Sequence, residues 1–321
     1  MQEDKNVDLQ QEAKDLVLKE LEKNEEEVRK AVHNTTIFAR VTPSQKRIIV
    51  DELRKMGKHV AMIGDGVNDL LALKAADCSI AMASGSDAVK AVSHLVSLDS
   101  NFSSLPQVVE EGRKVINNLQ RVCSIFLVKT LFAIFMSVLF LCLPQQEYPF
   151  KTSHLLAWEL FTIGLAPFFI ALEPNKERIK GGFIRNIVEE AIPGAFTQII
   201  LSLTLLCASY VYPSGFPLDG VLAVLIISLS FMSIVVLLHV CMPLNKYRSV
   251  VLIGTTILMA GMFGIDAYMK LKNIGTILDI NYAAINTSCC LLGVIAILVL
   301  IPLYFVFAHL FEKLMKRHHH E

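Results

Sequence analysis

Three polar side chains suited to bind a phosphate or a metal ion lie close together in the stretch HVAMIGDGVNDLLALKAAD. Asp65, Asn68 and Asp69 follow the apolar run VAMI, which is too short for a helix and predicts a buried strand. In open α/β sheets, ligands bind beyond the carboxyl ends of the strands. Gly64 and Gly66 would let the backbone turn tightly and approach a ligand closely. The pattern therefore predicts a polar ligand site on a glycine turn.

The residue types in this stretch suit phosphoryl chemistry. Asp65 could hold Mg²⁺, a hard cation that prefers carboxylate oxygens and keeps several waters. Lys46 could neutralise phosphate oxygens as a point charge. Asn68 could donate to a phosphate oxygen or orient an attacking water, and Asp69 could hold Lys46 or join the metal shell. A plain turn with solvated acids is the alternative for such a short motif.

Alternating strands and helices are expected around this turn. The strands are predicted at 36–41, 59–63, 78–82 and 94–98, and the helices at 5–33, 43–57, 67–76 and 86–93. Thr42 followed by Pro43 is typical of a helix start. Strands that alternate with helices indicate a parallel α/β sheet.

The remainder of the chain is membrane-like, since 53% of the 321 residues are hydrophobic. Apolar stretches long enough to cross a bilayer are predicted at 122–143, 154–172, 191–212, 218–241, 249–268 and 287–309. The fold class is thus a partial α/β domain followed by a bundle of six transmembrane helices. The domains expected are 1–104 (soluble), 105–121 (a stalk helix), 122–311 (membrane) and 312–321 (a tail).

Charge and cysteine placement give further expectations. Lys plus Arg equals Asp plus Glu, at 30 each, so no nucleic-acid partner is expected. Basic residues gather in 173–190, in 242–248 and in the tail, which by the positive-inside rule puts both termini in the cytoplasm of a multi-pass protein in the cell membrane. The seven cysteines form no CxxC pair and are expected to be reduced.

Longer motifs resemble a known family. FARVTPSQK, MIGDGVNDLLALKAAD and SIAMASGSDAVKAVSHLV occur in this order, and EEGRKVINNLQR follows them. These stretches resemble the hinge and phosphorylation-domain signatures of P-type ATPases, ion pumps with a haloacid-dehalogenase-like Rossmannoid domain. The six spans resemble the fifth to tenth helices of that family. The resemblance implies Mg²⁺ and ATP as cofactors of the complete pump.

The resemblance also implies roles for single residues. Asp65 matches the Mg²⁺-binding aspartate, Lys46 the lysine that contacts the aspartyl phosphate, and Asn68 and Asp69 the polar pair beside them. Gly64 and Gly66 would lie against the cofactor. The implied reaction forms and hydrolyses an acyl phosphate, which splits one hard step into two.

One departure from the family is decisive. The chain contains neither DKTGT, which carries the nucleophilic aspartate, nor TGE. It is therefore expected to be the carboxyl-terminal half of a pump, inactive alone, whose partner is the missing amino-terminal half. A natural fragment, a split gene and a truncated sequence stay open. The alternatives are a membrane-anchored haloacid-dehalogenase-type phosphatase and a partner subunit without catalysis.

Polar groups inside the predicted spans are candidates for a transported-ion site, because such groups are costly in a bilayer. Pro167 leaves a carbonyl of its own helix without a donor, and a broken helix could offer carbonyl oxygens to a cation. The family resemblance places an ion motif in the same span. The candidates are Lys129, Thr130, Glu159, Thr162 and Ile163.

Lys129 and Glu159 are not expected to pair directly. Lys129 lies about fourteen residues from the outer end of its predicted span and Glu159 about five, so their depths differ by on the order of 13 Å. Lys129 would then act as a built-in countercharge or extend its ammonium toward the cytoplasm. Ca²⁺ is the leading choice for the cation, and the absence of Cys-Pro-Cys argues weakly against a soft metal.

Overall fold

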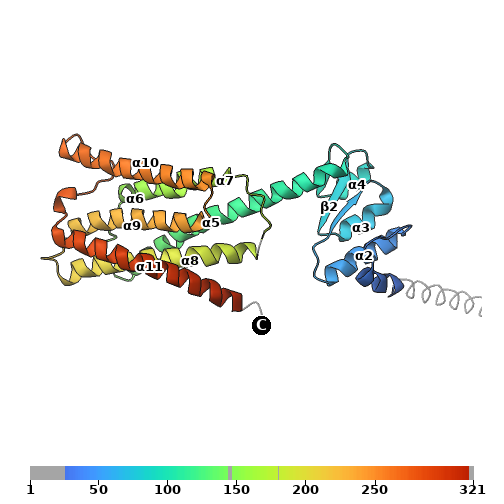
Figure 1. The fold of residues 1–321 in the computed structure, drawn as a ribbon, viewed down its shortest axis with the longest axis horizontal. Coiled ribbons are helices and arrows are strands. Elements are labelled where there is room, and N and C mark those ends of the chain that lie inside the picture. Colours follow the sequence, from blue (N-terminus) through green and yellow to red (C-terminus); the bar gives the residue numbers. More distant parts are fainter. Residues whose placement is uncertain (1–25, 144–146, 180, 318–321) are drawn as a thin grey trace, which may run out of the picture. The chain divides into compact units, whose positions relative to one another are not determined.

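The computed structural model describes residues 26–143, 147–179 and 181–317. The chain divides into two compact units, Met1–Pro106 and Gln107–Glu321, and each is described by itself (Figure 1). The tail sequence RHHHE lies almost entirely outside the described residues.

The first unit is built on a parallel sheet of three strands in the order β1-β2-β3. The strands are β1 (Ala61–Gly64), β2 (Cys78–Met82) and β3 (Leu95–Ser97), and the helices are α2 (Pro43–Lys55), α3 (Leu70–Ala75) and α4 (Asp87–Val92). Ile63 pairs with Ile80, and Ile80 pairs with Leu95. α3 and α4 pack on the sheet, and α2 packs on α3 (Figure 1). The predicted α/β class is confirmed.

Local sequence explains where α2 begins. The Thr42 hydroxyl accepts from the backbone of Gln45, and the Gln45 side chain accepts from the Thr42 amide at 2.9 Å. This reciprocal pair satisfies two amides at the start of the helix, and Pro43 supplies a suitable φ. Gly57, just beyond the helix, has φ +75°, a conformation that glycine adopts without strain.

The prediction of a strand at 36–41 was wrong. No residue of that interval is assigned to a strand, and Arg40 has a positive φ of 55°. The run TTIFARV has β-forming residues, but β-propensity takes effect only where a neighbouring strand and a buried face are present. Ile37 is 84% exposed, so this interval has neither.

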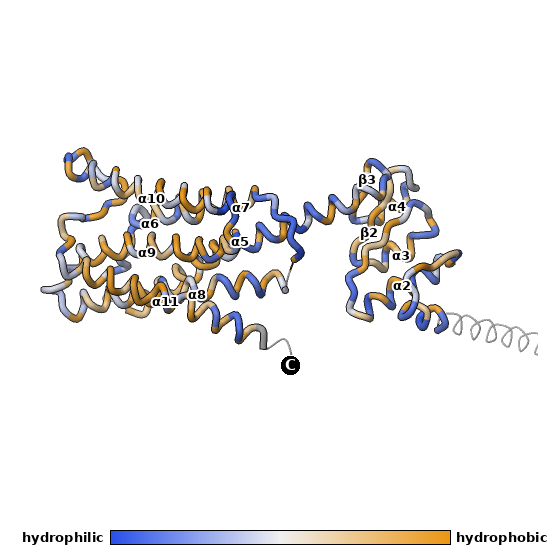
Figure 2. The backbone as a smooth tube through the Cα atoms, viewed as in Figure 1, coloured by the Kyte–Doolittle hydropathy of each residue, from blue (hydrophilic) through white to orange (hydrophobic). Residues whose placement is uncertain are grey.

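The second unit contains long apolar helices. They are α5 (Leu105–Leu141), α6 (Thr152–Trp158), a π-helical segment (Glu159–Leu165), α7 (Ala166–Ala171), α8 (Phe183–Val211), α9 (Leu218–Val240), α10 (Lys246–Leu271) and α11 (Thr287–Arg317). Among the described residues, six helices are long and apolar enough to cross a membrane, α6 to α7 counting as one. Apolar residues run along α9 from end to end, whereas polar residues mark the first turns of α5 (Figure 2). The predicted six-helix bundle is confirmed.

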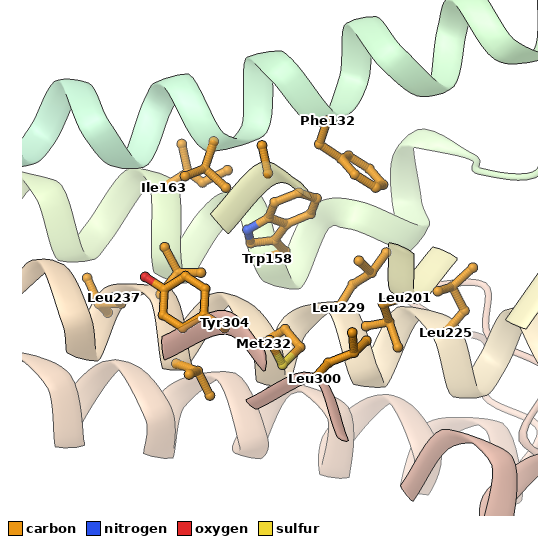
Figure 3. Packing of buried hydrophobic residues seen from close by; sticks show 14 of the residues in the cluster. Phe132, Trp158, Ile163, Leu201, Leu225, Leu229, Met232, Leu237, Leu300 and Tyr304 are labelled. Atoms are coloured by element: carbon orange, nitrogen blue, oxygen red, sulfur yellow. The ribbon is translucent and has the colours of Figure 1, made fainter. Parts of the chain in front are cut away.

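The core of the bundle gathers around α9, which contacts α6, α8, α10 and α11. Phe132 of α5 meets Trp158 of α6 edge to face, with ring centroids 5.4 Å apart (Figure 3). Tyr304 of α11 is fully buried on the other side of this core. Close packing of this kind holds the helices in one register.

The helix of the second span is continuous, with a locally wider turn in place of a break. Residues from Thr152 to Ala171 are helical throughout, with a π-helical stretch over Glu159–Leu165 that ends just before Pro167. The Ala166 amide donates to the Phe161 carbonyl, five residues back. A π-helical turn accommodates an extra residue and often lies at a functional site. The expected break is thus replaced by a local change of helix type.

Candidate functional site

The glycine turn and α2 bring Lys46 and Asp69 together. The Lys46 ammonium lies 2.6 Å from Oδ1 of Asp69, although 23 residues separate them in sequence. Asp69 is buried, with 8% of its surface exposed, and Lys46 is partly buried. A Cβ built on Gly64 would lie 2.6 Å from the Asp69 Cβ, so only glycine leaves room for this carboxylate. The backbone of β1 therefore sets the position of the lysine head group.

Asp65 lies at the carboxyl end of β1 and is exposed. Its carbonyl accepts from the Ser86 amide at 2.9 Å, which joins the loop after β1 to the start of α4. A Cβ on Gly85 would come within 2.7 Å of the same carbonyl. Two neighbouring loops at one edge of the sheet thus fix the Asp65 backbone and leave its carboxylate open to a ligand.

Gly66 and Asn68 complete the turn. Gly66 has φ −107°, which any residue can adopt, and a Cβ there would meet no atom within 4 Å. The fold itself therefore does not require glycine at this position. A ligand that approaches the backbone closely would require it. Asn68 is exposed within the short 3₁₀ helix Val67–Asp69.

The donor set at this edge fits Mg²⁺. No group of three or more His, Cys, Asp or Glu side chains suited to hold a metal occurs among the described residues. Mg²⁺ is commonly held by one or two carboxylates together with substrate phosphates and waters, rather than by a cage of protein ligands. Asp65 alone offers such a carboxylate here, because the Asp69 carboxylate already binds Lys46.

Lys129 and Glu159 form a direct ion pair, contrary to expectation. The Lys129 ammonium lies 2.7 Å from Oε1 of Glu159, and each side chain is about one-third exposed. α5 ends at Leu141 and α6 begins at Thr152, so the two residues lie about twelve and seven residues from those ends. Their depths then differ by roughly 8 Å, which the two long side chains can bridge. The error lay in the predicted ends of the spans.

The other three candidates for the ion site make contacts within their own helices or in the apolar core. The Thr130 hydroxyl is exposed and donates to the Phe126 carbonyl of its own helix at 2.9 Å. The Thr162 hydroxyl is buried and donates to the Trp158 carbonyl at 2.6 Å. Ile163 is buried in the apolar core and lies in the π-helical segment (Figure 3). Glu159 and Thr162 are thus the polar side chains of the unusual segment itself.

Sequence analysis missed a buried charge cluster built on Glu173, just after α7. Its carboxylate is 3.1 Å from Arg121 of α5 and 2.8 Å from Arg248 of α10, and it accepts from Asn245 at 2.7 Å. Asn118 donates to the Glu173 carbonyl at 2.7 Å. We name these residues the Glu173 cluster. Glu173 lies just beyond the predicted span 154–172. Only its position next to that span could have indicated a buried charge.

Two other carboxylates organise loops. Asp266 is fully buried and accepts from the amide of Leu278 at 2.9 Å and from the hydroxyl of Thr276 at 2.8 Å. In the first unit, the Val60 amide donates to Asp77 at 2.9 Å, and this bond, together with nearby Arg54, holds the pKa of the Asp77 carboxyl below its usual value. Both roles are structural.

Comparison with known proteins finds similar sequences. A family model described as haloacid dehalogenase-like hydrolase matches residues 7–109. The chain is 40% identical to a calcium-transporting ATPase, CtpE, of Mycobacterium tuberculosis over 58% of its length, and 34% identical to the probable cation-transporting ATPase exp7 of Streptococcus pneumoniae over 71%. It is 33% identical to a calcium-transporting ATPase of Listeria monocytogenes over 56%.

These alignments cover only part of each relative. They span 24% of CtpE, 30% of exp7 and 20% of the Listeria protein. The chain therefore spans less than a third of the length of the curated relatives it matches. The described part of the first unit, with its glycine turn, lies within the matched family model.

Proposed function

We propose that the chain corresponds to part of a cation-transporting P-type ATPase and that it carries the magnesium half of the phosphorylation site together with six helices of the transport domain. The observation that carries the proposal is the Lys46–Asp69 pair, 2.6 Å long, whose aspartate lies on the same glycine turn as the exposed Asp65. A lysine fixed by a buried carboxylate presents a cation at one position rather than over a range of positions. That is the arrangement a phosphate group needs for electrostatic stabilisation.

In this proposal each residue of the turn has one task. Asp65 supplies the carboxylate for Mg²⁺, which when bound would neutralise charge on the phosphate oxygens. Lys46 donates to a phosphate oxygen, and Asp69 holds Lys46 in place. Gly66 leaves the space beside the backbone free for the phosphate, and Asn68 donates to it or to the attacking water. The phosphorylated aspartate would come from another part of the complete pump.

We further propose that Glu159 is the central side chain of the ion site and that the cation is Ca²⁺. Carboxylate and carbonyl oxygens suit this hard cation, and two of the relatives named above are calcium-transporting ATPases. In the structure, the Lys129 ammonium binds Oε1 of Glu159. Cation binding would require the ammonium to leave, so Lys129 would be the internal counter-ion of Glu159. Thr162 and the Ile163 carbonyl would complete the site.

The proposal also includes orientation and partners. Basic residues concentrate in segments 173–190 and 242–248, which favours the cytoplasmic side for these segments and for both termini. The bilayer would surround the six helices, and the remaining part of the pump would supply the nucleotide and the nucleophile.

A chimeric pump tests the proposal, with this chain replacing the matching region of exp7. The measurement is acid-stable label from γ-labelled ATP and cation-stimulated ATP hydrolysis in proteoliposomes. We expect both activities in the chimera, and loss of hydrolysis in Asp65→Asn. Full hydrolysis in that variant would exclude Asp65 from the metal site.

A further inference from the structure

A cavity of about 750 Å³ lies in the second unit beside the Glu173 cluster. It is bounded by α5, the loop after α7, α8, the end of α9 and α11, and it opens between exposed loop residues such as Glu177 and Arg178. It contains none of the candidate ion-site residues. Its size falls within the range of ligand pockets.

Three residues that line this cavity each carry a buried polar atom without a partner. Among the described residues, Nε2 of Gln120, Oε2 of Glu190 and Nδ1 of His239 are buried and make no hydrogen bond, and all three residues line the cavity. Gln120 is 9% exposed. The Tyr304 hydroxyl, on a ring whose centroid is 5.4 Å from that of His239, is also unpartnered. An unsatisfied buried polar group is costly, so these atoms require an occupant.

The mixture of donors and acceptors identifies the occupant. The Gln120 amide nitrogen donates and the Glu190 oxygen accepts. Buried waters typically make two to four hydrogen bonds to groups of this kind. A metal ion does not fit, because the described residues contain no group of three metal-ligating side chains. Water that enters from the solvent is the occupant that suits the polar residues of the cavity wall.

Glu190 also has an electrostatic task. Its carboxylate interacts with Arg121 and with the Ser124 side chain. In the Glu173 cluster two guanidinium groups, of Arg121 and Arg248, share the single carboxylate of Glu173. An ionised Glu190 therefore balances the second guanidinium. Buried charges are stable only when they are paired, so protonation of Glu190 would leave one positive charge uncompensated.

We propose that this cavity is a hydrated proton-binding site in which Glu190 takes up and releases a proton and thereby sets the net charge of the Glu173 cluster. A hydronium ion in the cavity gives its proton to the Glu190 carboxylate, an O–H bond forms there, and a water molecule remains. The cluster links α5, the loop after α7 and α10, so the proton acts where three spans are joined. The proposal does not depend on transport.

Other charged and titratable groups surround Glu190. On its own helix they are Arg185 and Glu189, which pair with each other at 2.7 Å. From α5 and α10 they are Arg121 and Arg248, and from the loop after α7 they are Glu173, Glu177 and Arg178. From the end of α9 and from α11 they are His239, Cys241, Tyr304, His309 and Glu312.

Infrared difference spectroscopy of the full chain in nanodiscs tests the protonation. On stepwise acidification, a carboxylic-acid carbonyl band should appear in the wild type and be lost in Glu190→Gln. Glu189→Gln is the matched control and should retain it, because that carboxylate belongs to the Arg185 pair. A wild-type spectrum identical to that of Glu190→Gln at every pH would overturn the proposal.

Variants of two residues near Glu190 test its coupling to the Glu173 cluster. In Arg121→Gln the midpoint of this band should move to higher pH, because the carboxylate loses a positive neighbour. Ser124→Ala, a milder change that serves if Arg121→Gln does not fold, should shift it in the same direction by removing a hydroxyl beside the carboxylate. A midpoint unmoved in the folded variants would contradict the coupling.

Thiol labelling tests the hydration. A small water-soluble thiosulfonate should label Gln120→Cys, which faces the cavity, and should not label Ser202→Cys, which is fully buried in α8 away from it. Mass spectrometry of the peptides separates these sites from the native exposed cysteines. Absence of label at position 120 would show a closed, dry cavity and overturn the proposal.

Discussion

Two lysines in this chain are held on carboxylates at nearly equal distances, in two very different settings. Lys46 lies 2.6 Å from Asp69 in the first unit, and Lys129 lies 2.7 Å from Glu159 between two long apolar helices of the second. Asp69 is fixed by its own turn, where Gly64 leaves space for it. Glu159 lies at the start of a π-helical segment, a less regular backbone.

This difference in setting indicates that the same lysine–carboxylate contact serves two purposes. A carboxylate that is buried and fixed holds the lysine in one place, so Lys46 can serve as a preset charge for an incoming phosphate. A pair that is one-third exposed and joins two helices can separate with a small helix movement. Lys129 therefore suits exchange with a cation. The predictions below test this contrast in the chimeric pump or in the full chain.

The largest effect is expected at Lys46. Lys46→Met should lower ATP turnover of the chimeric pump by ~10²–10³-fold, the usual loss when one preset electrostatic contact to a transition state is removed. Steady-state hydrolysis at saturating cation measures it. Lys90→Met, which removes a lysine paired with Asp87 elsewhere in the same unit, is the matched control and should keep wild-type turnover.

A smaller effect, on affinity rather than turnover, is expected at the intramembrane pair. Glu159→Gln should weaken the apparent Ca²⁺ affinity by about tenfold or more, equivalent to at least about 1.4 kcal/mol. Lys129→Met should tighten it, because the competing ammonium is gone. Calcium titrations of ATP hydrolysis measure both. Equal affinities in Lys129→Met and the wild type would contradict the role of counter-ion.

The two glycines of the turn should separate folding from function. Gly64→Ala should lower the unfolding free energy by about 1–3 kcal/mol, because the added methyl overlaps Asp69. Gly66→Ala should change it by less than about 0.5 kcal/mol, since the site is open. Denaturant titration of the full chain checks both values. In the chimeric pump Gly66→Ala should nevertheless reduce turnover, and an unaffected turnover would remove Gly66 from the phosphate site.

The smallest effect concerns acid stability of the first unit. The lowered pKa of Asp77 means that its carboxylate stabilises the folded state above the unfolded-state pKa of about 3.9. That contribution is lost as the pH falls through the lower folded-state value. The protection factor of the Val60 amide, which compares its exchange rate with the intrinsic rate at each pH, should therefore fall in acid. Asp77→Asn should show the faster exchange already at neutral pH, and a wild-type rate there would contradict this role.

The sequence predicted the first unit better than the second for a physical reason. Residues near the glycine turn are fixed by local geometry, so strand, turn and helix follow from short stretches such as VAMIGDG. The strand expected at 36–41 failed because a strand needs a partner that local sequence does not specify. The bounds expected for the domains remain a prediction.

In the second unit, the spans were predictable and their contacts were not. Hydropathy locates an apolar helix to within a few residues, but each residue of error shifts a side chain by about 1.5 Å along the axis. That error separated Lys129 from Glu159 in the prediction. The Glu173 cluster joins three elements far apart in sequence, and no spacing rule connects them.

The central claim is that the turn after β1 forms one half of a phosphorylation site. Its most direct test is the amount of acid-stable, hydroxylamine-sensitive label formed from γ-labelled ATP by this chain, alone and co-expressed with the amino-terminal region of exp7. The account predicts label only when both parts are present, with rapid turnover lost in Asp65→Asn and in Lys46→Met. Label formed and turned over at the wild-type rate in both variants would contradict it.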